Sequence, residues 1–104
     1  MTIHVTDVAI VGGGMVGGAL ALGLAQQGFT VTVLEKAAPP AFDPASAPDV
    51  RISAISAASV GLLKSLGVWD AIRAMRVHAY RRLETWEWES AHVAFDAAEL
   101  KLPE

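Results

Sequence analysis

Hydrophobic positions near the N-terminus follow a strand pattern, then a helix pattern, then a strand pattern again. Residues 5–11 are rich in β-branched side chains and end in an unbroken apolar run, which is typical of a strand buried in a parallel sheet. Apolar residues recur at helical spacing over residues 15–27, and residues 29–34 form a second strand-like run. Gly28 stands where helices commonly end in a left-handed residue. This order predicts a βαβ unit with two parallel strands and a right-handed crossover.

The next part of the chain predicts a loop followed by two short helices. Residues 37–48 hold four of the five prolines, which favours a loop. After an extended or irregular segment, Ser56 is suited to cap a helix over residues 57–66, with Gly67 as its end. Residues 69–75 also carry apolar side chains on one helical face, so we expect a second short helix there.

The last part of the chain predicts a β-hairpin. Polar and apolar residues alternate over residues 82–89, residues 90–91 suit a turn, and residues 92–96 are again strand-like. Trp86 and Trp88 are two positions apart, so in a strand they would share one face, where we expect them to pack in a core.

Four arginines lie close together just before and within this hairpin. We expect them to form a solvated basic face, with contact to anionic lipid as the alternative. They are Arg73, Arg76, Arg81 and Arg82.

The 27 residues from 8 to 34 carry no charged side chain, so a membrane span is an alternative to the βαβ unit. About 20 consecutive apolar residues are enough to cross a bilayer. The three glycines at positions 12–14 are poor helix formers, however. A signal peptide would need Lys or Arg before the apolar stretch, and none precedes it. The change of hydrophobic period within the stretch also favours separate strands and a helix.

Composition narrows the class of protein. The chain has 104 residues, 53% hydrophobic and 18% charged, with a net charge of −3 and a mean hydropathy of +0.40. This composition excludes intrinsic disorder, and the acidic balance offers no electrostatic footprint for nucleic acid. The absence of cysteine excludes thiolate chemistry, and the three histidines share no metal-ligand spacing, so we expect no metal site. So little charge on a short chain leads us to expect a marginally soluble piece of a larger protein.

A glycine pattern at the predicted strand-to-helix junction carries the functional signal. Gly12-x-Gly14-x-x-Gly17 lies directly between the first strand and the helix, and Glu35 ends the second strand 18 residues after Gly17. In this setting the pattern is the fingerprint of a dinucleotide site, where the three glycines allow a tight turn, the approach of a pyrophosphate and close helix packing. The carboxylate of Glu35 is expected to accept hydrogen bonds from the adenosine ribose.

These residues alone do not separate FAD from NAD, because both cofactors present an ADP half to such a unit. After Glu35 the chain enters a proline-rich loop rather than further βα units, which favours FAD. An NAD-binding dehydrogenase domain is one alternative. A non-catalytic truncated fragment that binds little is another.

Three segments resemble a known family: DVAIVGGGMVGG at residues 7–18, RISAIS at residues 51–56 and LGVWD at residues 66–70. They are similar to the FAD-dependent aromatic hydroxylases of ubiquinone biosynthesis, within the para-hydroxybenzoate-hydroxylase-like flavoprotein monooxygenases. Residues 80–103 are similar to one member, which acts on a demethoxy-ubiquinol. The resemblance covers essentially the whole chain but only the N-terminal part of a family protein.

The resemblance implies an α/β fold of the FAD/NAD(P)-binding, Rossmann-like type, incomplete relative to the full family fold. Residues 1–80 would be the N-terminal part of the FAD-binding domain, and residues 81–104 the start of a substrate-side β region. The cofactor would be FAD. Its ligands would be Gly12, Gly14 and Gly17 at the pyrophosphate, Glu35 at the adenosine ribose and Arg51 along the phosphate side of the flavin.

The family also implies an activity and partners. The reaction is hydroxylation of a demethoxy-ubiquinol ring with O2, on a prenylated quinol, with NAD(P)H as reductant and other ubiquinone-biosynthesis proteins as neighbours. The implied location is cytoplasmic, with a peripheral contact at the inner membrane face. No residue of this chain is a credible catalytic acid, base or nucleophile, so we do not expect the 104 residues alone to be active.

Overall fold

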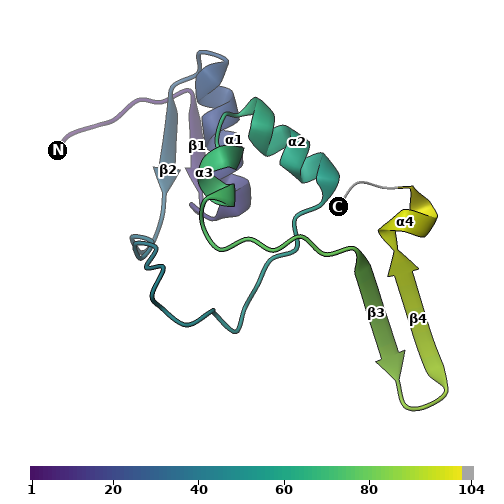
Figure 1. Ribbon diagram of the computed structural model, residues 1–104. Helices are drawn as coiled ribbons and strands as arrows, with labels where there is room; N and C mark the ends of the chain where they lie inside the picture. The colour runs from purple at the N-terminus through teal and green to yellow at the C-terminus, as the bar shows by residue number, and fades with distance from the viewer. Residues whose placement is uncertain (102–104) are drawn as a thin grey trace.

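The computed structural model describes residues 1–101, and this part of the chain contains both strands and helices, as in an α/β fold (Figure 1). The elements are β1 (Val8–Val11), α1 (Met15–Gln26), β2 (Val31–Leu34), α2 (Ala57–Ser65), α3 (Trp69–Arg73), β3 (Arg82–Glu87), β4 (Ala91–Asp96) and α4 (Ala97–Leu100).

The first three elements form the predicted βαβ unit. Strands β1 and β2 pair in parallel, with Val8 opposite Val31 and Val11 opposite Leu34, and α1 connects them. The chain leaves α1 through Gly28 at φ +94°, a conformation that residues with a side chain rarely adopt. Ile10 of β1 is among the few buried residues, so the small core lies where the strands meet α1.

Both strands are shorter than predicted, and a polar clasp joins the two residues that directly precede them, Asp7 and Thr30. The carboxylate of Asp7 accepts hydrogen bonds from the backbone N–H of Thr30 at 2.8 Å and from its hydroxyl at 2.9 Å. The backbone N–H of Asp7 in turn donates to the Thr30 hydroxyl at 2.9 Å. These donors, the Thr30 backbone N–H first, hold the pKa of Asp7 below its ordinary value of 3.8.

Helices α2 and α3 follow the predicted signals closely. The Ser56 hydroxyl caps α2 by accepting from the backbone N–H of Ser59 at 3.3 Å, and Gly67 follows the helix at φ +80°. Leu66, at the end of α2, is buried, and its carbonyl accepts from the Gln26 side chain at 2.9 Å. This contact joins the C-terminal ends of α1 and α2, which carry the rest of the small core.

Strands β3 and β4 form the predicted antiparallel hairpin, but the turn begins earlier than expected. Trp88 lies in the turn at φ +56° and therefore does not share a strand face with Trp86. Trp86 is 72% exposed and Trp88 is 86% exposed, so the expectation that they pack in a core is wrong for the residues described. Helix α4 was not predicted; its signal is Asp96, whose carboxylate accepts from the backbone N–H of Ala98 at 2.9 Å.

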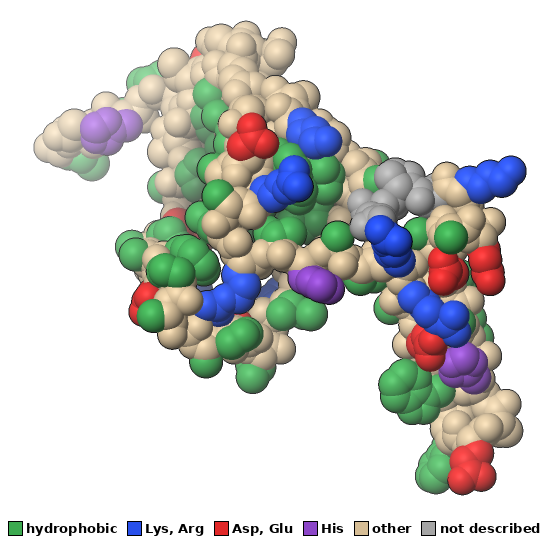
Figure 2. Space-filling view, in the orientation of Figure 1, with side chains coloured by type: hydrophobic (Ala, Val, Ile, Leu, Met, Phe, Trp, Pro, Cys, Tyr) green, Lys and Arg blue, Asp and Glu red, His purple; other side chains and the backbone are tan. Residues whose placement is uncertain are grey.

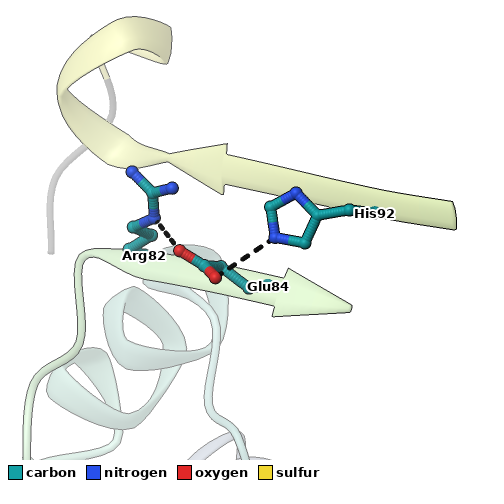
Figure 3. A network of polar contacts seen from close by, with 3 residues as sticks. All are labelled: Arg82, Glu84 and His92. Carbon is teal, nitrogen blue, oxygen red and sulfur yellow. Dashed lines mark hydrogen bonds and ion pairs between the residues drawn. The ribbon is translucent and has the colours of Figure 1, made fainter. Parts of the chain in front are cut away.

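One face of the hairpin carries a small polar network (Figure 3). The carboxylate of Glu84 is bonded to the Arg82 guanidinium on the same strand and lies 3.2 Å from the His92 ring nitrogen on β4. The hydrogen bond from His92, followed by that from Arg82, lowers the pKa of Glu84 below its ordinary value of 4.5. The Glu84–His92 contact joins β3 to β4, but because all three side chains are exposed, the network contributes little to stability.

All four arginines are exposed, as expected of a solvated face, and Arg76 and Arg82 also have partners within the chain. Arg82 is held by Glu84, and the guanidinium of Arg76 donates to the carbonyls of Pro44 at 3.0 Å and Ser46 at 2.6 Å. The Arg76 guanidinium also lies 5.8 Å from the centroid of the Phe42 ring. Arg76 therefore anchors the middle of the proline-rich loop to the segment that follows α3.

The described chain is extended and exposes much apolar surface. Its radius of gyration is 18.4 Å, against about 13 Å for a compact chain of this length. The hairpin stands away from the βαβ unit, and hydrophobic side chains are spread over the visible surface (Figures 1 and 2). Within residues 1–101 no helix is long and apolar enough to cross a membrane, because the uncharged stretch is divided among β1, α1 and β2.

The anchoring role of Arg76 is testable by limited proteolysis. We expect Arg76→Ala to speed chymotryptic cleavage after Phe42, because the loop loses two hydrogen bonds and a cation–π contact. Arg73→Ala, which removes an exposed arginine on α3, is the control. Mass spectrometry measures the cleavage rate of each variant. Equal cleavage rates in the two variants would contradict the anchoring role of Arg76.

Candidate cofactor site

The glycine loop lies at the C-terminal edge of the parallel strand pair, between β1 and α1. The backbone N–H of Gly12 donates to the carbonyl of Leu34 at 2.8 Å, which extends the pairing of β1 with β2 by one residue. The chain then turns sharply, since Gly12 has φ +102°. A residue with a Cβ would be strained in this conformation, so only glycine turns the chain here without cost.

Gly17 is required by close packing within the chain. A Cβ on Gly17 would lie 2.0 Å from the carbonyl oxygen of Gly12 and 3.4 Å from the Ile10 side chain. Helix α1 therefore rests directly on the turn that precedes it, and no side chain fits between them. This approach aims the N-terminus of α1 toward the open edge of the strand pair.

Gly14 has a different environment. No atom of the described chain lies within 4 Å of a Cβ built on Gly14, so packing within the chain does not demand a glycine there. Gly14 is also the N-cap residue of α1, and in the described residues no side-chain hydrogen bond caps this end of the helix. The loop thus leaves open space beside free donors at the positive end of a helix, an arrangement that suits an anion such as phosphate.

Glu35 faces this loop from the end of β2. Its Oε2 accepts a hydrogen bond from the backbone N–H of Gly13 at 2.7 Å, and its Oε1 accepts from the backbone N–H of Ala37 at 3.3 Å. These N–H donors, that of Gly13 first, hold the pKa of Glu35 below its ordinary value of 4.5. The exposed carboxylate is therefore ionised at neutral pH and remains within reach of a ligand on the loop.

Gly13 is the residue that the sequence pattern overlooked, since the motif treats its position as variable. A Cβ on Gly13 would lie 3.3 Å from the Cβ of Glu35 and 3.4 Å from a methyl group of Val33. The signal that could have identified it is the unbroken run of three glycines, which is longer than the motif requires.

The structure brings four of the five predicted site residues together: Gly12, Gly14, Gly17 and Glu35. Arg51 lies apart, exposed in the irregular segment after the proline-rich loop, where its backbone N–H donates to the Asp49 carboxylate at 3.3 Å. In the described part of the chain, no hydrogen bond joins the Arg51 side chain to the glycine loop. Its role at the cofactor remains a prediction.

The fold and the site define a class of protein. An α/β chain with a glycine loop, an open helix N-terminus and a facing carboxylate is a nucleotide-cofactor-binding module. The chain belongs to the FAD-binding domain family, whose model matches residues 5–103. This match confirms FAD, rather than NAD, as the predicted cofactor.

Curated relatives narrow the class further. The chain is 77% identical over 103 residues to the 3-demethoxyubiquinol 3-hydroxylase of Escherichia coli, which covers 99% of this chain and 26% of that protein. It is 47% identical over 68 residues to the ubiquinone hydroxylase UbiL of Rhodospirillum rubrum, covering 65% of this chain and 16% of that protein. It is 40% identical over 99 residues to the mitochondrial ubiquinone biosynthesis monooxygenase COQ6 of Xenopus tropicalis, and the match covers 88% of this chain and 21% of that protein. The chain thus spans about a quarter or less of these relatives, and the predicted resemblance to ubiquinone-biosynthesis hydroxylases is confirmed.

The packing of Gly17 gives a direct test of the loop geometry. We expect Gly17→Ala to destabilise the chain by about 1–3 kcal/mol, because the new methyl group would collide with the Gly12 carbonyl. Gly14→Ala, which meets no atom of the chain, should change stability by less than about 0.5 kcal/mol. Thermal unfolding followed by circular dichroism measures both variants, and equal losses would contradict the close approach.

Proposed function

We propose that this chain is the N-terminal FAD-binding portion of a flavoprotein monooxygenase that hydroxylates a demethoxy-ubiquinol ring with O2. The observation that carries the proposal is the open space at Gly14, flanked by uncapped N–H groups of α1 and facing the Glu35 carboxylate. A dinucleotide needs donors for its phosphates and an acceptor for its ribose, and both lie at this edge. The names of the relatives support the reaction class.

The residues fit FAD in defined roles. The pyrophosphate would lie on the loop at Gly12 and Gly14 and on the N-terminus of α1, which Gly17 holds close to the turn. The ribose hydroxyls would donate to Glu35. Arg51 would approach the phosphates from the segment after the loop, where a guanidinium can neutralise phosphate charge.

The proposal includes a Rossmann-like FAD-binding domain that begins with residues 1–80 and a substrate-side β region that begins at residue 81. The separation of the β3–β4 hairpin from the βαβ unit supports this division (Figure 1). Residues 102–104 lie outside the described residues.

Bound FAD would supply the redox chemistry with O2, and the residues of this chain would bind and orient it. We propose a prenylated quinol as substrate and NAD(P)H as reductant. Other ubiquinone-biosynthesis proteins and a peripheral contact at the inner face of the membrane complete the proposal. The names of the relatives support the quinone class of substrate.

Direct titration of the chain with FAD tests the cofactor site. We expect the chain to quench FAD fluorescence, and we expect Gly14→Ala to weaken binding by about tenfold or more, because its methyl group would occupy the space proposed for the pyrophosphate. Gly61→Ala is the matched control, since Gly61 lies in α2 and a Cβ there also meets no atom within 4 Å.

Two results would contradict the proposed site. One is wild-type chain that leaves FAD fluorescence unchanged while circular dichroism shows it to be folded. The other is Gly14→Ala that binds FAD as tightly as Gly61→Ala does.

A further inference from the structure

We propose that Glu35 is a positioning residue that sets the conformation of the glycine loop before the cofactor arrives. The inference rests on the proposed function, because it concerns the same site. The observation behind it is the 2.7 Å hydrogen bond from the backbone N–H of Gly13 to Oε2 of Glu35, which joins the loop to the end of β2 within the chain itself. Accepting ribose hydroxyls is then the second task of a carboxylate that already organises the site.

The loop needs such a constraint because it is built from glycine. Three consecutive glycines have more conformational freedom to lose on folding than any other sequence of this length. On either side of Gly13 the backbone is held, by the bond of Gly12 N–H to Leu34 and by the bond of Gly18 N–H to the Gly14 carbonyl. The bond to Glu35 holds the residue between these two anchors.

Glu35 is itself well placed to act as a fixed point. It directly follows Leu34, which pairs with Val11 and whose carbonyl accepts from the backbone N–H of Gly12. Its other carboxylate oxygen accepts from the backbone N–H of Ala37. An ionised carboxylate offers about four acceptor sites, so these two bonds leave capacity for the two ribose hydroxyls.

The space around Gly13 matches this role. The position of a Cβ on Gly13 lies 3.3 Å from the Cβ of Glu35 and 3.4 Å from its Oε2, closer than side chains usually pack. A side chain at position 13 would therefore displace the carboxylate that holds the loop. The glycine at this position and the glutamate at position 35 form one unit, although they are 22 residues apart in the sequence.

Backbone N–H donors lower the pKa of Glu35. The N–H groups of Gly13, Ala37 and Lys36 lower its pKa, and no charged side chain of residues 1–101 contributes to the shift. A carboxylate with a lowered pKa stabilises the folded loop at pH values above its ordinary pKa and loses this effect as the pH falls through the lowered value. The loop should therefore loosen only in acid, below pH 4.5.

A pH titration of the cofactor-free chain by 1H–15N NMR tests the positioning role. We expect the Gly13 amide proton to shift with a midpoint below 4.5 as Glu35 takes up a proton. In Glu35→Gln this pH-dependent shift of the Gly13 amide, the Gly13 step, should disappear, because the amide side chain does not titrate. Asp7→Asn is the matched control: it removes a backbone-bonded carboxylate at the opposite end of the same strands and should leave the Gly13 step intact. The amides of Ile10 and Val33 report whether the strand pair is still formed in each variant.

A stopped-flow measurement of FAD binding adds a second readout. If Glu35 organises the loop in advance, Glu35→Ala should slow FAD association by about tenfold, whereas loss of a ribose contact alone would raise only the dissociation rate. A Gly13 amide that does not titrate in the wild-type chain, or that titrates equally in Glu35→Gln, overturns the positioning role. Failure of the proposed function is separate, since the wild-type chain would then show the Gly13 step and yet bind no FAD.

Discussion

The contact of α1 with the turn before it sets the geometry on which the site depends. Because Gly17 has no side chain, α1 begins against the carbonyl of Gly12, and its first turn points at the edge where β1 and β2 end. Any larger residue would push the helix away from the strands and move its N–H groups. The open space at Gly14 and the reach of Glu35 both follow from this approach. The chemistry of the loop is thus a consequence of backbone packing rather than of reactive side chains.

Apart from the small core at Ile10 and Leu66, the described chain is held together mainly by polar contacts. The Asp7–Thr30 clasp, the Arg76 anchor on the proline-rich loop and the Glu84 network each join segments that share little buried surface. Exposed polar contacts define geometry but contribute modestly to stability. This explains why the loops keep a defined course although the core is small. It also fits the large apolar surface, which exceeds what an independent domain of this size usually exposes.

Local sequence signals predicted the elements well, and they failed where tertiary contacts decide the outcome. Ser56 and the glycines at positions 28 and 67 marked helix ends correctly because caps and positive φ angles are properties of a few neighbouring residues. The hairpin turn was misplaced because Trp88 adopts a left-handed conformation, which β propensity does not foresee for an aromatic residue. The four arginines are exposed as expected, but the sequence did not predict that Arg76 bonds to the distant proline-rich loop or that Arg82 bonds to Glu84 within the hairpin.

The sequence by itself determined the βαβ unit, the glycine turn and the acidic residue at the end of β2, because each depends on local backbone preference or hydrophobic period. Only the tertiary structure decided that Gly13, a variable position of the motif, is the donor to Glu35. The tertiary structure also distinguished the roles of Gly17 and Gly14. Close packing within the chain requires a glycine at position 17, whereas no contact within the described chain requires one at position 14. The physical reason is that parallel pairing brings the ends of β1 and β2 together across 22 residues of sequence, and only in that arrangement do the loop and the carboxylate meet.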